Sequence, residues 1–137
     1  AWPLRFVAGL DAPAKSVAAI ADVGEVWSEA RLNEVLASGR PAFVNMTADW
    51  CVNCKVNERA VLSQAAFRTA LEAADADYLK GDWTNEDPAI SSFLKQHCAV
   101  AVPLYVVYPQ NGGAPRVLPA LLTAGTVEEA LAWAAQP

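Results

Sequence analysis

Two cysteines with two residues between them, Cys51 and Cys54, have the type and spacing needed for thiol chemistry. Cys51 comes where a predicted strand ends and a predicted helix begins, and the free N–H groups and dipole of a helix start stabilise an anion there. Because the thiolate is the reactive form, this position lowers the thiol pKa and predicts that Cys51 is a nucleophile. Cys54 lies one helical turn further on and is more enclosed. It is therefore predicted to resolve the mixed disulfide that Cys51 forms.

The same cysteines allow other interpretations. A CxxC pair can be half of a zinc site, and His97 and Cys98 would supply two more ligands of suitable type. These two residues are adjacent, which is poor spacing for one tetrahedral ion, so no metal is expected and a zinc- or copper-binding module is kept as the alternative. An inert Cys51–Cys54 disulfide would close a very short loop and contribute little stability. Cys98 is expected to be a buried free thiol, the alternative being an oxidisable third thiol near the site.

The segments around the cysteines have the pattern of a buried strand followed by a long helix. The short apolar run 42–46 is bounded by residues that break secondary structure, which suits a central strand covered on both faces. Residues 52–71 favour helix, and Ser63 is predicted to cap a second helical segment after a kink. Upstream, Ser28 is the expected N-cap of a helix over 28–38.

Further along the chain, the pattern predicts strands, a helix, a hairpin and a last helix. Asp87 is the expected N-cap of a helix with Pro88 at its first position, which ends near His97, and His97 would interact there with the helix dipole. A capping box of Thr126 and Glu129 is expected to open the last helix. The remaining elements are strands over 78–83, 102–108 and 116–118, with a turn over 109–115.

Strands and helices alternate in this predicted order. Such alternation indicates an α/β fold with right-handed crossovers, a largely parallel sheet covered by helices, and an antiparallel edge at the terminal hairpin. Residues 1–22 keep neither a helical nor a strand period. We expect them to be an irregular leader or linker, and the domain to span 23–137.

Length, composition and charge limit the class of protein. The 137 residues suit one domain, and with 54% of them hydrophobic a core can form without disulfide staples. A formal net charge of −5 gives no reason to expect nucleic acid or an anionic membrane as a partner. No apolar run approaches the ~20 residues that span a bilayer, so this chain itself is not expected to insert into one. It begins at Ala1 rather than Met, and we expect a processed product or an excised domain.

The residues around the cysteines resemble a known family. Their run is Ala48-Asp49-Trp50-Cys51-Val52-Asn53-Cys54-Lys55. It is similar to the A-x-W-C-x-x-C-K motif of thioredoxins, and Val102-Pro103 resembles their cis-proline loop. More narrowly, the chain resembles the C-terminal periplasmic domains of DsbD-type thiol:disulfide interchange proteins and their ScsB-type relatives. The matching residues are the motif, Glu58, the run 81–85 and the segment 102–105. The resemblance covers residues 28–135 and implies a thioredoxin fold, with a central mixed β-sheet flanked by helices.

The resemblance also implies a role. In this family a transmembrane domain passes electrons from cytoplasmic thioredoxin to the C-terminal domain, which reduces a partner N-terminal domain. The chain would then be a protein-disulfide reductase and electron relay, a soluble periplasmic domain of an inner-membrane protein. It would act as a monomer on thiol and disulfide partners, the transmembrane and N-terminal domains of its own parent, with no cofactor beyond the redox-active Cys51–Cys54 disulfide. A free-standing cytoplasmic thioredoxin is the alternative. The direction of electron flow depends on the reduction potential relative to the partner.

Residues near the cysteines also receive roles from the resemblance. Pro103 is expected to be cis and to expose the Val102 backbone to a bound partner strand. Trp50 is expected to pack beside the disulfide and to shape the docking surface, with a place in the core as the alternative. Asn45 stands where the family has a buried acid, and an amide cannot accept a proton as a carboxylate does. Glu58 matches an acidic residue of the family and is expected to tune or shuttle protons, the alternative being a solvated helix glutamate.

Overall fold

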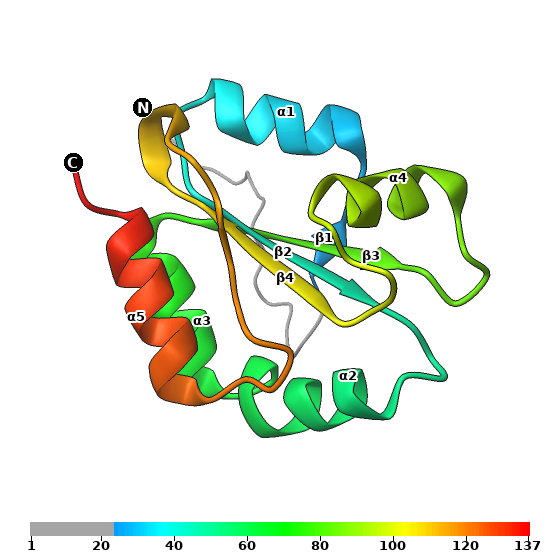
Figure 1. Ribbon diagram of the computed structural model, residues 1–137. Coiled ribbons are helices and arrows are strands. Elements are labelled where there is room, and N and C mark those ends of the chain that lie inside the picture. The colour runs from blue at the N-terminus through cyan, green and yellow to red at the C-terminus, as the bar shows by residue number, and fades with distance from the viewer. Residues whose placement is uncertain (1–23) are drawn as a thin grey trace, which may run out of the picture.

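A five-stranded sheet forms the centre of the molecule (Figure 1). The structure, a computed structural model, describes residues 24–137, so the expected leader at 1–22 lies outside the described residues. The strands are β1 (Glu25–Val26), β2 (Ala42–Thr47), β3 (Asp77–Asp82), β4 (Leu104–Tyr108) and β5 (Arg116–Val117). The helices are α1 (Glu29–Ala37), α2 (Val52–Asn57), the π-helical turn η1 (Glu58–Leu62), α3 (Ala65–Ala74), α4 (Pro88–Gln96), the 3-10 turn η2 (Gln110–Gly112) and α5 (Ala124–Ala134). Within residues 24–137, no helix is both long and apolar enough to cross a membrane.

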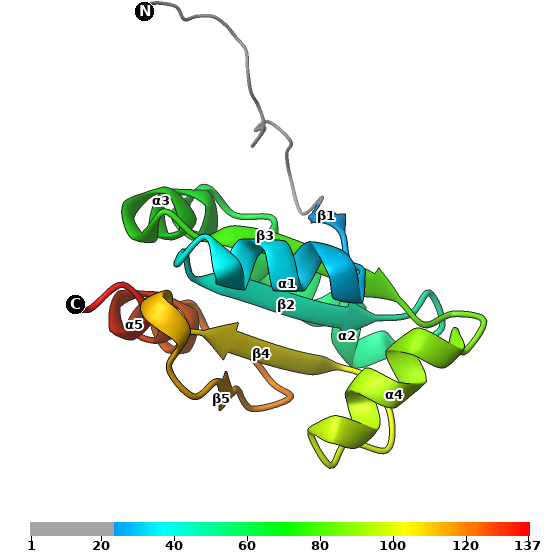
Figure 2. The ribbon, with the colours of Figure 1, turned by 90° about the horizontal axis from the view of Figure 1, so that it is seen from above.

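The strands lie in the order β1-β3-β2-β4-β5. β3 pairs in parallel with β1 and β2, whereas β4 is antiparallel to both β2 and β5. The sheet is mixed, but it is less parallel than the alternation of elements predicts, because the direction already reverses between β2 and β4. The placement of α4 near the end of β3 explains the difference (Figure 2). The chain re-enters the sheet from that end, and Leu104 at the start of β4 pairs with Met46 near the end of β2.

Helices cover both faces of the sheet, so two hydrophobic cores form (Figure 2). Side chains alternate between the two faces along β2. Phe43 lies in the core beneath α3 and α5, whereas Val44 and Met46 lie in the core beneath α1 and α4. All six residues of β2 are buried, as the predicted central strand requires. Because burial of each large apolar side chain stabilises the fold by roughly 1.5–3 kcal/mol, β2 is a firm anchor for the segment that follows it.

Local signals in the sequence determine where two of the helices begin. Ser28 Oγ accepts a hydrogen bond from the Arg31 N–H at 3.0 Å, and Asp87 Oδ1 accepts one from the Ala89 N–H at 2.8 Å. Each bond satisfies a donor that a helix start leaves free. Ser28 and Asp87 are therefore confirmed as N-caps of α1 and α4.

The long helix predicted after the cysteines is divided. α2 continues as the π-helical turn η1, and α3 begins after a break at residues 63–64. The break is where the sequence predicts a kink, but Ser63 is not the cap of α3. Its hydroxyl donates to the Arg59 carbonyl at 3.0 Å, so it completes the turn before the break, and Gln64 occupies the N-cap position without a side-chain bond.

Two other elements differ from the prediction. α5 begins at Ala124, before the predicted capping box, because Thr123 Oγ1 accepts a hydrogen bond from the Thr126 N–H at 3.1 Å. Thr126 thus lies inside the first turn instead of opening it. β1 is not predicted at all, because a strand of two residues carries no periodic signal.

Candidate functional site

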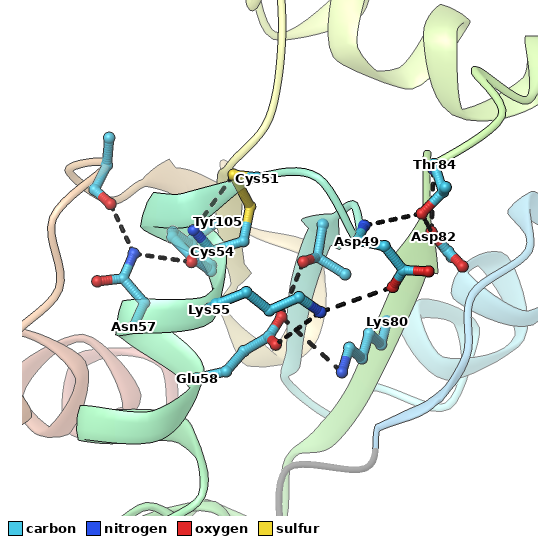
Figure 3. Close-up of a disulfide and its surroundings, with 12 residues drawn as sticks. Asp49, Cys51, Cys54, Lys55, Asn57, Glu58, Lys80, Asp82, Thr84 and Tyr105 are labelled. Carbon is cyan, nitrogen blue, oxygen red and sulfur yellow. Dashed lines mark hydrogen bonds and ion pairs between the residues drawn. A yellow bond between two sulfur atoms is a disulfide. The ribbon is translucent and has the colours of Figure 1, made fainter.

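The disulfide between Cys51 and Cys54 lies at the start of α2, after the loop that follows β2 (Figure 3). Cys51 is the N-cap of α2, and its Sγ accepts a hydrogen bond from the Cys54 N–H at 3.2 Å. This N–H is a donor left free at the helix start, so the position is suited to stabilise a thiolate on Cys51. Cys54 is fully buried, whereas Cys51 keeps 7% of its surface exposed. Cys54 is the more enclosed of the two, as the sequence predicts.

The loop before β4 packs against the two cysteines. Val102 contacts the buried cluster formed by Ala48, Cys51 and Cys54. The peptide bond between Val102 and Pro103 is cis, as expected. The fold therefore brings this distant segment to the disulfide, and its pairing with a partner strand stays a prediction.

Trp50 lies on the surface beside Cys51 and not in the core, with 51% of its surface exposed. Its Nε1 donates to the Thr84 carbonyl at 3.1 Å, and its ring centroid lies 5.9 Å from that of Trp83. The preceding Asp49 N–H donates to Thr84 Oγ1 at 2.8 Å, and this hydroxyl donates to Asp82 Oδ1 at 2.5 Å. The turn after β3 therefore holds the segment before Cys51. The resemblance pointed to this run of residues, but nothing in the sequence assigned Thr84 a contact.

Glu58 is buried at the end of α2, with 6% of the residue exposed. The alternative of a solvated helix glutamate is therefore wrong. Thr47 Oγ1 donates to Glu58 Oε2 at 2.8 Å. Lys55 Nζ lies 3.6 Å from Oε1, and Lys80 Nζ lies 3.9 Å from Oε2 (Figure 3). Both oxygens have partners, which offsets the cost of burying a carboxylate. Sequence reasoning missed Thr47, because a β-branched residue directly after the predicted strand 42–46 carries no sign of a partner.

Asn45 is fully buried on β2, two residues before Thr47. Its Nδ2 donates to the Tyr78 hydroxyl at 3.0 Å, and its Oδ1 has no hydrogen-bond partner among residues 24–137. An amide does not accept a proton as a carboxylate does, so this side chain links β2 to β3 without acid–base capacity. Within residues 24–137, Glu58 is the only buried carboxylate.

Comparison with known proteins identifies the family. Residues 23–110 match the family model described as thioredoxin-like. The chain belongs to the thioredoxin-like family. The thiol:disulfide interchange protein DsbD of Ralstonia nicotianae is 32% identical over 111 residues, which are 80% of this chain and 18% of that protein. DsbD 1 of Pseudomonas aeruginosa is 31% identical over 84 residues, which are 61% of this chain and 14% of that protein. The chain therefore spans less than a fifth of the length of these curated relatives.

Solved structures share the fold of this thioredoxin-like domain. The oxidised C-terminal domain of DsbD from Neisseria meningitidis aligns with a TM-score of 0.62 at 20% identity, over 77% of this chain and 95% of that one. Thioredoxin f from spinach chloroplast aligns with a TM-score of 0.59 at 23% identity, over 88% of this chain and 100% of that one. These similarities confirm the predicted thioredoxin fold, a central mixed sheet flanked by helices.

A buried amide holds α2, the helix that carries Cys54 in the thioredoxin-like domain. Asn57 Nδ2 donates to the Tyr105 hydroxyl at 2.9 Å and to the Ala120 carbonyl at 2.7 Å, while its Oδ1 accepts from the Leu122 N–H at 3.1 Å. These bonds join α2 to β4 and to the segment before α5. The sequence did not single out Asn57, because an asparagine within a helical pattern carries no sign of its partners.

The end of α4 differs from the prediction in two ways. Cys98 is free and exposed, not buried, and with a φ of 60° it occupies the left-handed position that ends the helix. His97 packs on Phe93 with ring centroids 4.7 Å apart, and burial lowers its pKa. Burial therefore favours the neutral imidazole over the charged form that would interact with the helix dipole. In residues 24–137, no three or more histidine, cysteine or acidic side chains are grouped to hold a metal ion.

Proposed function

We propose that this chain is a thiol–disulfide oxidoreductase domain, which works as a reductase and relays electrons from a transmembrane domain to a disulfide of a partner domain. The proposal depends chiefly on the Cys51 Sγ at the start of α2, which accepts the Cys54 N–H. A sulfur in this position is stabilised as a thiolate, and the second sulfur is within bonding reach. The names of the DsbD relatives, which describe thiol:disulfide interchange, support the proposal.

The proposed reaction has two exchange steps. The Cys51 thiolate attacks a partner disulfide, whose S–S bond breaks as a mixed disulfide forms, and the partner's other sulfur leaves as a thiolate and takes up a proton. The Cys54 thiol then gives its proton to the Glu58 carboxylate and attacks the Cys51 sulfur. The Cys51–Cys54 disulfide forms, and the partner's first sulfur leaves and is protonated. Two electrons have then moved to the partner, and a dithiol of the upstream domain reverses the exchange to restore the reduced pair.

A partner would dock on the exposed apolar side chains next to the cysteines. Trp50 and Val52, the chain neighbours of Cys51, are 51% and 75% exposed, and the Val102 backbone is the proposed edge for a partner strand. Exposed apolar side chains gathered beside a reactive group are typical of an interaction site. They suit an extended segment of a protein that carries the disulfide.

We place the domain in the periplasm, as a monomeric part of an inner-membrane protein whose transmembrane and N-terminal domains are its partners. Support comes from the relatives, since this chain matches 18% and 14% of their lengths. It also comes from the likeness to a DsbD C-terminal domain. Sequencing the full gene is the direct check: hydrophobic spans upstream of Ala1 are expected, and their absence would favour a free-standing thioredoxin.

Trapping of the mixed disulfide tests the reaction. In Cys54→Ser the resolving thiol is missing, so we expect a covalent adduct between Cys51 and the partner domain on a non-reducing gel. Cys98→Ser should give no adduct, because Cys54 remains to resolve it. If Cys54→Ser never forms an adduct with any disulfide-bearing partner domain, the proposal is wrong.

The reduction potential of the Cys51–Cys54 pair tests the direction. A reductase of this kind should have a potential near that of thioredoxin, about −270 mV. A value near about −120 mV, which is typical of a strong periplasmic oxidant, would contradict the reductase role. Equilibration with glutathione or with a thioredoxin of known potential measures it.

A further inference from the structure

The Glu58 carboxylate and the Thr47 hydroxyl connect two elements beneath the disulfide. Thr47 is the last residue of β2, and Glu58 directly follows α2. The hydrogen bond from Thr47 Oγ1 to Glu58 Oε2 is 2.8 Å long, and the two residues are 4% and 6% exposed. A hydrogen bond to a buried carboxylate is directional, so it determines where the acceptor points.

Charged groups also face Glu58 from α2 and β3. The Nζ atoms of Lys55 and Lys80 lie 3.6 and 3.9 Å from its oxygens, beyond the length of a charge-assisted hydrogen bond. Lys55 Nζ is equally close, at 3.6 Å, to the exposed Asp49. The pKa of Asp82 is lowered by hydrogen bonds within its own turn and, to a smaller extent, by both lysines. The lysines thus divide their attraction among several carboxylates, and the hydroxyl is the group that orients Glu58.

Glu58 shares a helical face with Cys54. The Glu58 N–H donates to the Cys54 carbonyl, and a spacing of four residues places both side chains on one side of the helix. Cys54 is fully buried, so the proton that it loses has no direct route to solvent. Ala48, which directly follows Thr47, belongs to the buried cluster that contains Cys54.

We propose that Thr47 is a positioning residue for the resolving step, in which its hydroxyl holds the Glu58 carboxylate ready for the proton of Cys54. The inference rests on the proposed function, because it concerns the attack of Cys54 on the mixed disulfide. A hydroxyl both donates and accepts. It donates to the carboxylate and, once Glu58 has taken the proton from the Cys54 sulfur, turns to accept from the carboxylic acid. A methyl group in its place would do neither.

Reduced protein mixed with the aromatic disulfide dithiobis(nitrobenzoate) separates the two steps. Attack by Cys51 releases one coloured thiolate and leaves a mixed disulfide. Attack by Cys54 releases the second thiolate in a phase whose rate does not depend on reagent concentration. All proteins carry Cys98→Ser, because the exposed thiol of Cys98 would otherwise react. The variants are Thr47→Val, which keeps the shape and removes the hydroxyl, and the matched control Thr47→Ser, which keeps the hydroxyl.

We expect Thr47→Val to slow the second phase by about tenfold near neutral pH and to shift its pH profile upward, with the first phase unchanged. Thr47→Ser should restore the second phase to within about twofold of the parent. Equal second phases in Thr47→Val and Thr47→Ser would overturn the inference. A parent protein without a second phase would instead contradict the proposed function itself.

A double variant tests whether Thr47 acts through Glu58. If Thr47 acts through this carboxylate, Thr47→Val should cause no further slowing in a Glu58→Gln background. A further tenfold slowing of the second phase in this background would show that Thr47 acts in another way and would overturn the inference. Circular dichroism checks the fold, and if Thr47→Val is unfolded, Thr47→Ala is compared with Thr47→Ser in the same way.

Discussion

Asn57 shows at the scale of one residue how a buried polar group holds the helix of the candidate site. Its amide uses both donor and acceptor atoms, on Tyr105, Ala120 and Leu122. Burying an amide that has these partners costs little free energy. Removing the amide leaves the Leu122 N–H without this acceptor. Since the helix that contains Asn57 also carries Cys54, this residue connects the stability of the fold to the geometry of the site.

We expect Asn57→Ala to lower the free energy of unfolding by about 1–3 kcal/mol, the usual cost of leaving buried polar groups unpaired. Urea unfolding of the oxidised protein measures the change. Asn53→Ala is the matched control, because Asn53 is exposed on the same helix and should change stability by less than about 0.5 kcal/mol. Equal losses in the two variants would show that Asn57 does not stabilise the helix through its partners.

At the scale of elements, the turn after β3 supports the segment that leads into α2. The Trp83 N–H donates to the Thr47 carbonyl at 2.7 Å, and Thr84 accepts from the Asp49 N–H and from the Trp50 indole. A loop that lacks regular backbone pairing is held in this way by another loop. The exposed Trp50 is thereby presented beside Cys51 in a defined orientation.

Thr84→Val should loosen this contact, because valine keeps the shape of threonine but cannot accept the Asp49 N–H. We expect the Asp49 amide to exchange with deuterium roughly tenfold faster, as measured by NMR. Thr84→Ser keeps the acceptor and should leave the exchange rate near that of the parent. Unchanged exchange in Thr84→Val would mean that the loop is held by other contacts.

At the scale of the whole molecule, the site lies at one end of the sheet, where β2 and β3 end and β4 begins (Figure 1). The disulfide and the buried Glu58 come from the segment around α2, whereas the cis Val102–Pro103 bond comes from the loop before β4. Each segment is attached to a buried strand or helix, so a rigid core positions groups that themselves lie on loops and helix starts. This arrangement requires the complete fold, and a peptide with the CxxC alone would lack it.

Global stability should depend on pH through His97, the single histidine of the chain. Burial lowers its pKa in the folded state, so as pH falls below about 6.5 the unfolded chain binds a proton that the folded chain resists. Stability is then expected to fall with pH, until pH drops below the lowered pKa of the folded state. Urea unfolding at several pH values measures this slope, and His97→Gln should flatten it. Identical slopes in both proteins would rule out a contribution from His97.

The sequence alone determined the features whose signals are local. The CxxC pair at the start of a helix and the caps Ser28 and Asp87 each depend on residues within one turn of the chain. The central position of β2 followed from a short apolar run with breakers on both sides. The thioredoxin fold and the cis bond before Pro103 followed from motifs. Local conformational preference and burial of a continuous apolar run are physical properties of the segment itself.

Only the tertiary structure decided which polar side chains meet. Thr47 and Glu58 are 11 residues apart, Asp49 and Thr84 are 35 apart, and Asn57 and Leu122 are 65 apart. No period or motif marks such pairs, because each depends on how a helix or loop packs against the sheet. The burial of Glu58, the exposure of Cys98 and the reversed direction of β4 have the same origin. Chain segments select their own conformation, but the environment of a side chain is determined by the elements that pack around it.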